Sequence, residues 1–177
     1  RSTLFPYTTL FRSRTGPVFP MDFSRNTFDR QSKMSDKFLK DTTLQNKVTA
    51  IWTFFAEMGK SMPPLSEEII AGILNRTKAS IDKIKARGGR VLFVRTPSSG
   101  PMGMGENMGF PRDKFWNKLL AVTNSPGIHF TDYPPIAHFV CPEWSHLSPQ
   151  DAIVFTKHFI DILNKEKGWK FSKLAGN

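Results

Sequence analysis

The chain has 177 residues, 39% of them hydrophobic, a single cysteine and a formal net charge of +10. This length fits one domain, and Cys141 alone excludes both an intrachain disulfide and a metal site built from several cysteines. No apolar run approaches the ~18 residues of a membrane-spanning helix, and the scattered basic residues favour solvated helix faces over a nucleic-acid surface.

Residues 1–13, RSTLFPYTTLFRS, resemble the conceptual translation of a sequencing adapter. They do not form a signal peptide, because Pro6, Thr8 and Thr9 interrupt the apolar run that such a peptide needs. Without this segment the chain has 23 basic and 15 acidic residues, a net charge of +8. We therefore set residues 1–13 apart as non-native sequence, and we expect the natural protein to extend upstream of Arg14.

Three further segments follow from composition and periodicity. Residues 14–43 are polar, and their phenylalanines follow no regular period, so we expect a loop-rich, irregular segment. Residues 44–168 are expected to form the C-terminal part of one α/β domain. Residues 169–177 are expected to be a tail.

The first predicted elements of this domain are two helices and a strand. Residues 44–58 carry apolar side chains at steps of three and four, which is typical of an amphipathic helix. Residues 66–87 form a second helix, because Ser66 is a good N-cap and two glycines end the pattern. Residues 90–95 contain the run VLFV, which predicts a strand buried on both faces. Residues 96–109, rich in glycine, methionine and proline, predict a long loop.

Alternation of helix and strand continues after this loop. Residues 111–121 predict a helix, and residues 127–132, GIHFTD, predict a second strand. After a loop over residues 133–147, Ser148 and Pro149 match the N-cap and first position of a final helix. Helices that alternate with strands predict a doubly wound α/β fold with a parallel sheet.

The segment PEWSHLS places His146 three residues after Glu143, directly before the final helix. A serine hydrolase needs an accessible imidazole as general base and an acid that fixes its tautomer. This block resembles the Asp-x-x-His block that precedes the C-terminal helix of SGNH/GDSL hydrolases. The resemblance covers roughly residues 65–163, in which GGRVLFV and GIHFTDYP resemble the last two strands of the family's flavodoxin-like sheet.

The resemblance implies a partial flavodoxin-like parallel sheet with flanking helices, whose first strand or strands are missing. It implies that His146 is the catalytic base and that Glu143 orients it, without a cofactor. Two features depart from the family. The acid is Glu rather than Asp, and the chain has neither a Gly-Asp-Ser nor a Gly-x-Asn-Asp block. We therefore expect the serine nucleophile, and part of the oxyanion hole, to lie upstream of Arg14.

Three residues around the 96–109 loop are candidate substrate contacts: Arg95, Ser98 and Ser99. Loops at the carboxyl ends of strands form the binding sites of open α/β sheets. The glycines of this loop follow neither nucleotide-binding pattern, so we expect no nucleotide. We expect no metal either, because the histidines show no ligand spacing, and His129 is expected to be packed or hydrogen-bonded within its strand.

Two functions follow from these observations. The first is a fragment of an SGNH-type serine esterase or O-acyltransferase, inactive by itself, whose substrate is a small-molecule or carbohydrate ester. The alternative is a non-catalytic flavodoxin-like α/β module that binds a small ligand or a protein partner. The resemblance is compatible with an extracytoplasmic or membrane-anchored bacterial protein, in which membrane contact occurs only through a lost N-terminal segment. No nucleic-acid partner is expected.

Overall fold

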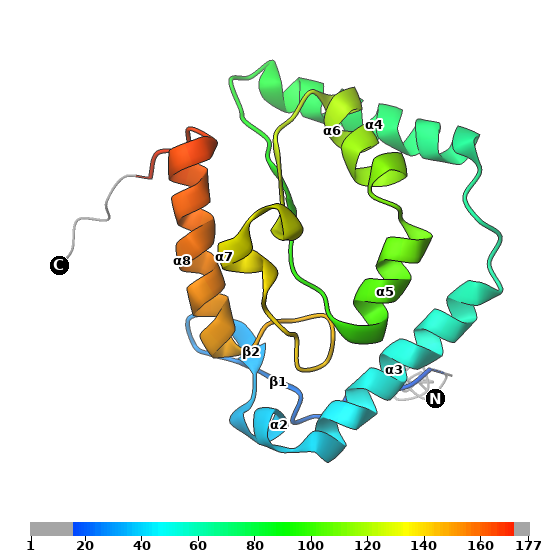
Figure 1. The fold of residues 1–177 in the computed structure, drawn as a ribbon, viewed down its shortest axis with the longest axis vertical. Coiled ribbons are helices and arrows are strands. Elements are labelled where there is room, and N and C mark those ends of the chain that lie inside the picture. Colours follow the sequence, from blue (N-terminus) through cyan, green and yellow to red (C-terminus); the bar gives the residue numbers. More distant parts are fainter. Residues whose placement is uncertain (1–15, 172–177) are drawn as a thin grey trace, which may run out of the picture.

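The computed structural model describes residues 16–171 as a mixed α/β structure with two small sheets (Figure 1). The segment set apart as adapter-derived, residues 1–13, lies outside the described residues, as do residues 172–177. One sheet pairs β1 with β2 in antiparallel orientation, and the other pairs β3 with β4 in parallel.

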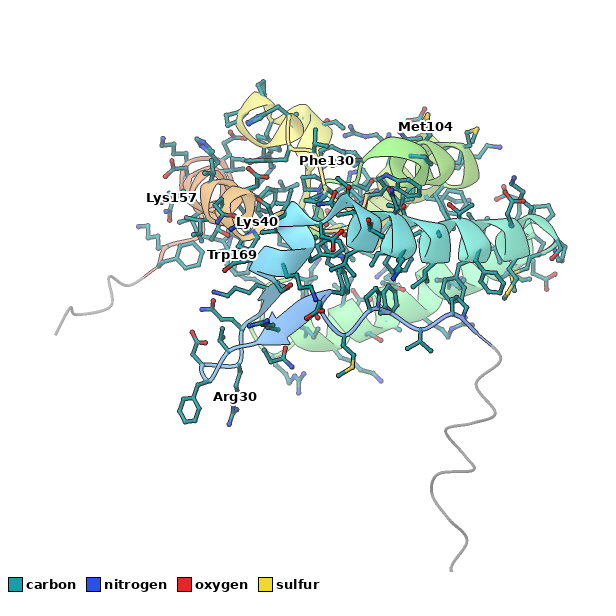
Figure 2. All side chains as sticks on the ribbon, turned by 90° about the horizontal axis from the view of Figure 1, so that it is seen from below. Arg30, Lys40, Met104, Phe130, Lys157 and Trp169 are labelled. Carbon is teal, nitrogen blue, oxygen red and sulfur yellow. The ribbon has the colours of Figure 1, made fainter. Side chains whose placement is uncertain are left out.

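Residues 14–43 contain more regular structure than their composition predicts. Strands β1 (Ser24–Asn26) and β2 (Ser32–Met34) form a hairpin, and helix α2 (Asp36–Lys40) follows it. Arg30 makes the turn with a positive φ of 64° and lies at the outer end of the hairpin (Figure 2). The prediction of an irregular segment was wrong for these elements, because strands of three residues are too short to establish an alternating pattern.

A first hydrophobic cluster joins this segment to helix α3 (Thr42–Lys60). Asp41 caps α3 by accepting hydrogen bonds from the backbone N–H groups of Thr43, at 2.9 Å, and Leu44, at 3.3 Å. The buried members of the cluster come from β2, α2 and α3, and are Met34, Phe38, Leu44 and Val48. Phe23 and Trp52 pack against them from the edge. Phe23 and Phe38 therefore belong to a core, whereas Phe28 remains fully exposed.

Helix α4 (Glu67–Lys85) confirms the predicted helix and its cap. Ser66 Oγ accepts the backbone N–H of Ile69 at 3.2 Å, as expected of an N-cap serine. The helix packs against α6 (Lys118–Thr123), next to which it lies in Figure 1. Only some of the isoleucines of this helix are buried: Ile70 and Ile81 are covered, whereas Ile69 remains exposed.

Strands β3 (Phe93–Arg95) and β4 (Gly127–His129) are parallel, as the helix–strand alternation predicts, and Arg95 is the register partner of His129. The prediction that the first strand is buried on both faces was wrong, because Val94 is 39% exposed. In the part of the chain that the structure describes, β3 pairs only with β4. Among the described residues its outer edge therefore has no strand partner, and the face that carries Val94 is partly exposed.

The connection between β3 and β4 is more helical than expected. The predicted loop over residues 96–109 contains helix α5 (Gly100–Gly109), which sequence reasoning missed because four glycines strongly disfavour a helix. Pro101 fits the first turn of α5, where no backbone donor is needed. The next predicted helix is divided between a π-helical turn, η1 (Asp113–Asn117), and α6.

The C-terminal region forms the second hydrophobic cluster. After β4 come a short 3₁₀ helix, η2 (Phe130–Asp132), and helices α7 (Pro134–Ala137) and α8 (Pro149–Glu166). The second predicted strand therefore ends at His129 rather than at residue 132. Helix α8 lies beside α7 (Figure 1). The buried cluster between them comprises Ile128, Ile136, Phe139, Ile162 and Leu163.

Trp169, at the start of the predicted tail, packs against this second cluster, and its backbone N–H bonds to Leu163 O at 3.0 Å. The expected tail therefore begins with an anchored residue. No helix among residues 16–171 combines the length and apolar character needed to cross a lipid bilayer.

Candidate functional site

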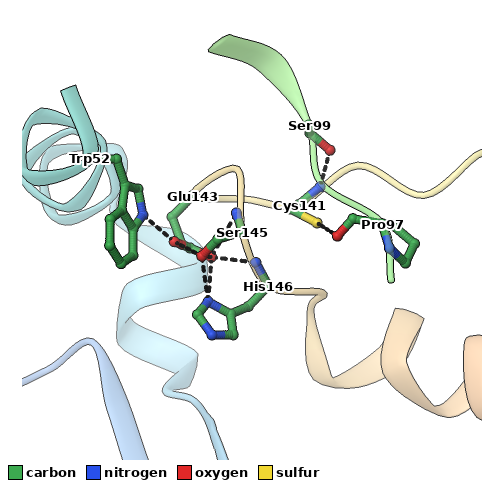
Figure 3. A network of polar contacts seen from close by, with 7 residues as sticks. All are labelled: Trp52, Pro97, Ser99, Cys141, Glu143, Ser145 and His146. Atoms are coloured by element: carbon green, nitrogen blue, oxygen red, sulfur yellow. Dashed lines mark hydrogen bonds and ion pairs between the residues drawn. The ribbon is translucent and has the colours of Figure 1, made fainter. Parts of the chain in front are cut away.

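Residues 141–148, here called the dyad loop, connect α7 to α8 and hold both Glu143 and His146. Trp144 has a positive φ of 77°, a strained conformation for a bulky residue. At the end of the loop Ser148 caps α8, because its Oγ accepts the backbone N–H of Asp151 at 3.1 Å. The turn at Trp144 places the side chains of Glu143 and His146 on the same side of the loop (Figure 3).

The dyad loop is attached to the segment that follows strand β3. Ser99 donates its backbone N–H to Trp144 O at 2.8 Å, and its hydroxyl accepts the backbone N–H of Cys141 at 2.8 Å. The ring of Trp144 covers Gly100, where an added Cβ would lie 3.0 Å from the ring. Gly100 also has a φ of 53°, so this close approach requires a glycine. The loop is therefore held at the carboxyl end of the parallel strand.

Glu143 is the centre of the hydrogen-bond network in Figure 3. Its side chain is 0% exposed, and a buried carboxylate needs donors for both oxygens. Oε1 accepts the backbone N–H groups of His146, at 2.6 Å, and Ser145, at 3.2 Å. Oε2 accepts the hydroxyl of Ser145 at 2.8 Å and the indole N–H of Trp52 at 2.6 Å.

His146 presents one ring nitrogen to this carboxylate and the other away from it (Figure 3). Nδ1 lies 2.9 Å from Glu143 Oε1 and 2.7 Å from Ser145 Oγ. An N–H at Nδ1 that donates to the carboxylate leaves Nε2 as the acceptor in the neutral ring. The side chain is 62% exposed, and no hydrogen bond within residues 16–171 involves Nε2. The predicted pair is therefore assembled, with its basic nitrogen accessible.

The two groups shift each other's pKa in opposite directions. The hydrogen bond that His146 donates to Glu143 raises the pKa of His146 above its ordinary value, and partial burial of the ring opposes this only in part. Burial by itself raises the pKa of Glu143, but the hydrogen bonds from His146, Trp52 and Ser145 outweigh it and lower that pKa overall. The pair therefore favours an ionised acid beside a more basic imidazole.

Trp52 belongs to this site although the sequence gives no sign of it. Its place among apolar residues at helical spacing indicates a core side chain, and its ring does lie at the edge of the first hydrophobic cluster. Only its indole N–H, which reaches Glu143 from helix α3, gives it a second role. No motif identifies such a contact, because 91 residues separate the two partners.

The N-terminal aromatics also approach the imidazole. Phe23 meets the His146 ring edge-on, with ring centroids 6.2 Å apart. Phe19 stacks on Phe23 at 5.5 Å and lies 5.1 Å from the Trp52 ring. An aromatic wall from residues 14–43 therefore borders the exposed base.

The predicted substrate contacts already bond to other residues of this chain: they are Arg95, Ser98 and Ser99. Arg95 and Ser98 both bond to the Glu106 carboxylate, Ser98 at 2.5 Å, and Arg95 also donates to Ser98 Oγ at 3.0 Å. Ser99 holds the dyad loop, as described above. The structure thus links Ser99 to the site by direct contact, whereas Arg95 and Ser98 form a separate cluster with Glu106.

The end of strand β4 carries another histidine in a different setting. His129 Nδ1 lies 2.8 Å from Thr131 Oγ1, and its ring packs between Trp116 and Phe130. Burial, and then the charge of the Arg112 guanidinium, lower the pKa of His129. His129 is packed and hydrogen-bonded, as its position in the predicted strand indicates. Among the described residues no cluster of three or more His, Cys, Asp or Glu side chains forms a metal site.

Comparison with known proteins identifies no matching family model, no similar curated protein and no similar solved structure.

Proposed function

We propose that Glu143 and His146 are the orienting acid and the general base of an SGNH-type serine esterase or O-acyltransferase. One observation carries this proposal: a fully buried carboxylate holds Nδ1 of His146 while Nε2 remains accessible. This is the arrangement that a serine hydrolase requires of its acid and its base. No cofactor takes part in the proposed reaction.

In this mechanism a serine hydroxyl attacks the carbonyl carbon of an ester, and Nε2 of His146 takes its proton. Glu143 stabilises the resulting imidazolium through its bond to Nδ1. The imidazolium then returns the proton to the leaving alcohol, and the acyl group remains on the serine. Water completes hydrolysis, or a second alcohol completes acyl transfer. Substrates of this reaction are esters, and a carbohydrate O-acyl group is the proposed class.

The fold is consistent with this proposal at one specific place. Ligands of open α/β sheets bind at the carboxyl ends of the parallel strands, and Ser99 attaches the dyad loop just beyond the end of β3. We propose that β3 and β4 correspond to the last two strands of a flavodoxin-like sheet. Arg95 and Ser98, which lie at the same strand end, remain proposed substrate contacts, and they must first separate from Glu106.

The nucleophile of the proposed reaction is not Ser145, although its hydroxyl lies near the ring. Ser145 is on the Nδ1 side of His146, where it donates to Glu143, and a nucleophile must bond to Nε2. Among residues 16–171 no serine hydroxyl bonds to Nε2 of His146. The proposal therefore assigns the nucleophile to a Gly-Asp-Ser block in sequence upstream of Arg14.

The experiment that tests this proposal uses a chain extended by its upstream coding sequence and measures hydrolysis of short-chain esters. We expect His146→Ala to lower kcat by about 10³-fold or more, as in other triads. His138→Ala is the matched control, because His138 is exposed and bonds only to Pro134 O among the described residues. Unchanged turnover with His146→Ala would remove this residue from the mechanism.

The second candidate is a non-catalytic α/β module that binds a small ligand or a protein partner. The observation that favours it is the network around Glu143, because the same bonds that orient His146 also attach the dyad loop to α3. In such a module the network would serve only stability. An upstream sequence without a Gly-Asp-Ser block, together with a lack of esterase activity, supports this candidate over the enzyme.

A further inference from the structure

The carboxylate of Glu143 receives its donors from two sources. Four donor groups lie within the dyad loop: the backbone N–H groups of Ser145 and His146, the Ser145 hydroxyl and the His146 ring. Trp52 is the only donor from outside the loop among the described residues, with its Nε1 at 2.6 Å from Oε2. The indole N–H is therefore the one hydrogen bond that joins this carboxylate to a described segment outside the dyad loop.

Within the dyad loop, the backbone N–H groups of Ser145 and His146 contact Oε1 alone and already direct this oxygen toward the imidazole. The Ser145 hydroxyl lies 3.0 Å from Oε1, 2.8 Å from Oε2 and 2.7 Å from His146 Nδ1, so it contacts all three atoms. Trp52, by contrast, contacts Oε2 alone. The indole therefore fixes the second oxygen from outside the dyad loop, while Oε1 keeps its bond to Nδ1.

The indole itself is well fixed. Trp52 lies within α3, packs at the edge of the first hydrophobic cluster and contacts Phe19 with ring centroids 5.1 Å apart. An indole N–H donates a hydrogen bond but neither accepts one nor titrates. Trp52 can therefore stabilise an ionised carboxylate at any working pH without introducing a competing charge.

We propose that Trp52 is a positioning residue of the site: its indole N–H fixes Oε2 of Glu143 so that Oε1 stays directed at Nδ1 of His146. The catalytic meaning of this assignment rests on the proposed function, but the geometric claim does not. It gives residues 16–60 a place in the site, because the hairpin and α2 are packed on the helix that carries Trp52.

The test is a pH titration of His146 in the full chain, in which NMR of the imidazole signals gives the pKa. Within the described residues Glu143 is the one charged group that acts on His146, and His146 the one that acts on Glu143. Trp52→Phe keeps the ring but removes the donor. The freed Oε2 then turns toward water or takes a proton, and either change weakens the bond at Nδ1. We expect the pKa of His146 to fall by about half a unit or more toward its ordinary value.

The matched control is Trp116→Phe, which removes an indole N–H from a ring that packs against His129 instead. It should leave the titration of His146 unchanged. A purely structural role of Trp52 predicts a lower melting temperature with the same His146 titration, and that result would overturn the proposal.

A second measurement needs no substitution and applies even if Trp52→Phe fails to fold. In the unmodified chain, the Trp52 indole N–H signal should lie downfield and should shift with pH at the midpoint of His146. The proposal is contradicted if this signal has the chemical shift of an exposed indole and does not change with pH at the midpoint of His146. The two hypotheses also separate: if His146→Ala leaves ester hydrolysis intact while Trp52→Phe shifts the His146 titration, only the proposed function fails.

Discussion

The dyad loop and the end of strand β4 both place an acid near a histidine, but they arrange the acid differently. Glu143 is fully buried and bonds directly to Nδ1 of His146, whose ring is largely exposed. Asp132 is exposed and pairs with Arg112 through two bonds of 2.6 and 2.7 Å, while the nearby His129 is half-buried and its ring bonds to a hydroxyl. A buried acid bonded to an exposed ring therefore gives a more basic imidazole, whereas partial burial of the ring near the Arg112 guanidinium gives a less basic one.

The largest expected effect comes from removing the buried acid. Glu143→Ala leaves the Trp52 indole and two backbone N–H groups without an acceptor, and unsatisfied buried donors are costly. We expect the free energy of unfolding, measured by urea denaturation, to fall by about 3 kcal/mol. Glu106→Ala is the matched control, because Glu106 pairs with Arg95 nearer the surface and should cost at most about 1 kcal/mol. Equal losses in the two variants would contradict the comparison.

The next effect is the pH dependence of stability that arises from the shifted pKa values of His146 and Glu143. The raised pKa of His146 means that its contribution to stability is present below pH ~6.5 and is lost as pH rises through the folded value. The lowered pKa of Glu143 gives a contribution that is present above its ordinary value and is lost as pH falls through the folded value. The pair therefore contributes most at mildly acidic pH, between these two limits.

His129 has the opposite sign, because burial lowers its pKa and its protonation favours the unfolded state. NMR titration should place the midpoints of His146 and His129 on opposite sides of the ordinary value of ~6.5. If His146 titrates below His129, the assignment of the basic imidazole is incorrect.

For the proposed enzyme, the neutral ring is the base, so kcat/KM should rise with pH through the raised pKa of His146.

The smallest expected effect concerns the surface pair at the end of β4. Asp132→Asn removes the bidentate partner of Arg112, whose side chain is also largely exposed. We expect a loss of about 0.5 kcal/mol at low salt, because exposed ion pairs contribute little and salt screens them. Urea denaturation at low and at high sodium chloride concentration measures this difference. A loss as large as that of Glu143→Ala would show that burial does not explain the different contributions of Glu143 and Asp132 to stability.

Much of the local structure was predictable because local sequence determines it. Ser66 and Ser148 cap helices where their positions predicted, and Glu143 and His146 meet because a three-residue spacing within one loop needs no distant partner. Capping and short-range pairing depend on neighbours in the chain, and such interactions are visible in sequence.

The features that were missed depend on contacts between distant segments or on unfavourable propensity. Helix α5 forms despite four glycines, and Gly103 approaches Ser98 so closely that an added Cβ would lie 3.2 Å from the Ser98 carbonyl oxygen. Composition alone predicts a loop there. Val94 was expected to be buried because a run of apolar residues is typical of a central strand, but burial depends on neighbouring strands that the local sequence does not specify. Trp52 was missed for the same reason, since its partner lies on another segment.

The separation between Trp52 and Glu143 also has a consequence for the order of folding. Glu143 and His146 are three residues apart and can meet as soon as the loop forms, whereas the bond to Trp52 closes a segment of 91 residues. Closing so long a segment carries a large entropic cost, and contacts of this range form late when a chain folds. If Trp52 positions Glu143 as proposed, the imidazole would reach its full basicity only after the N-terminal cluster docks.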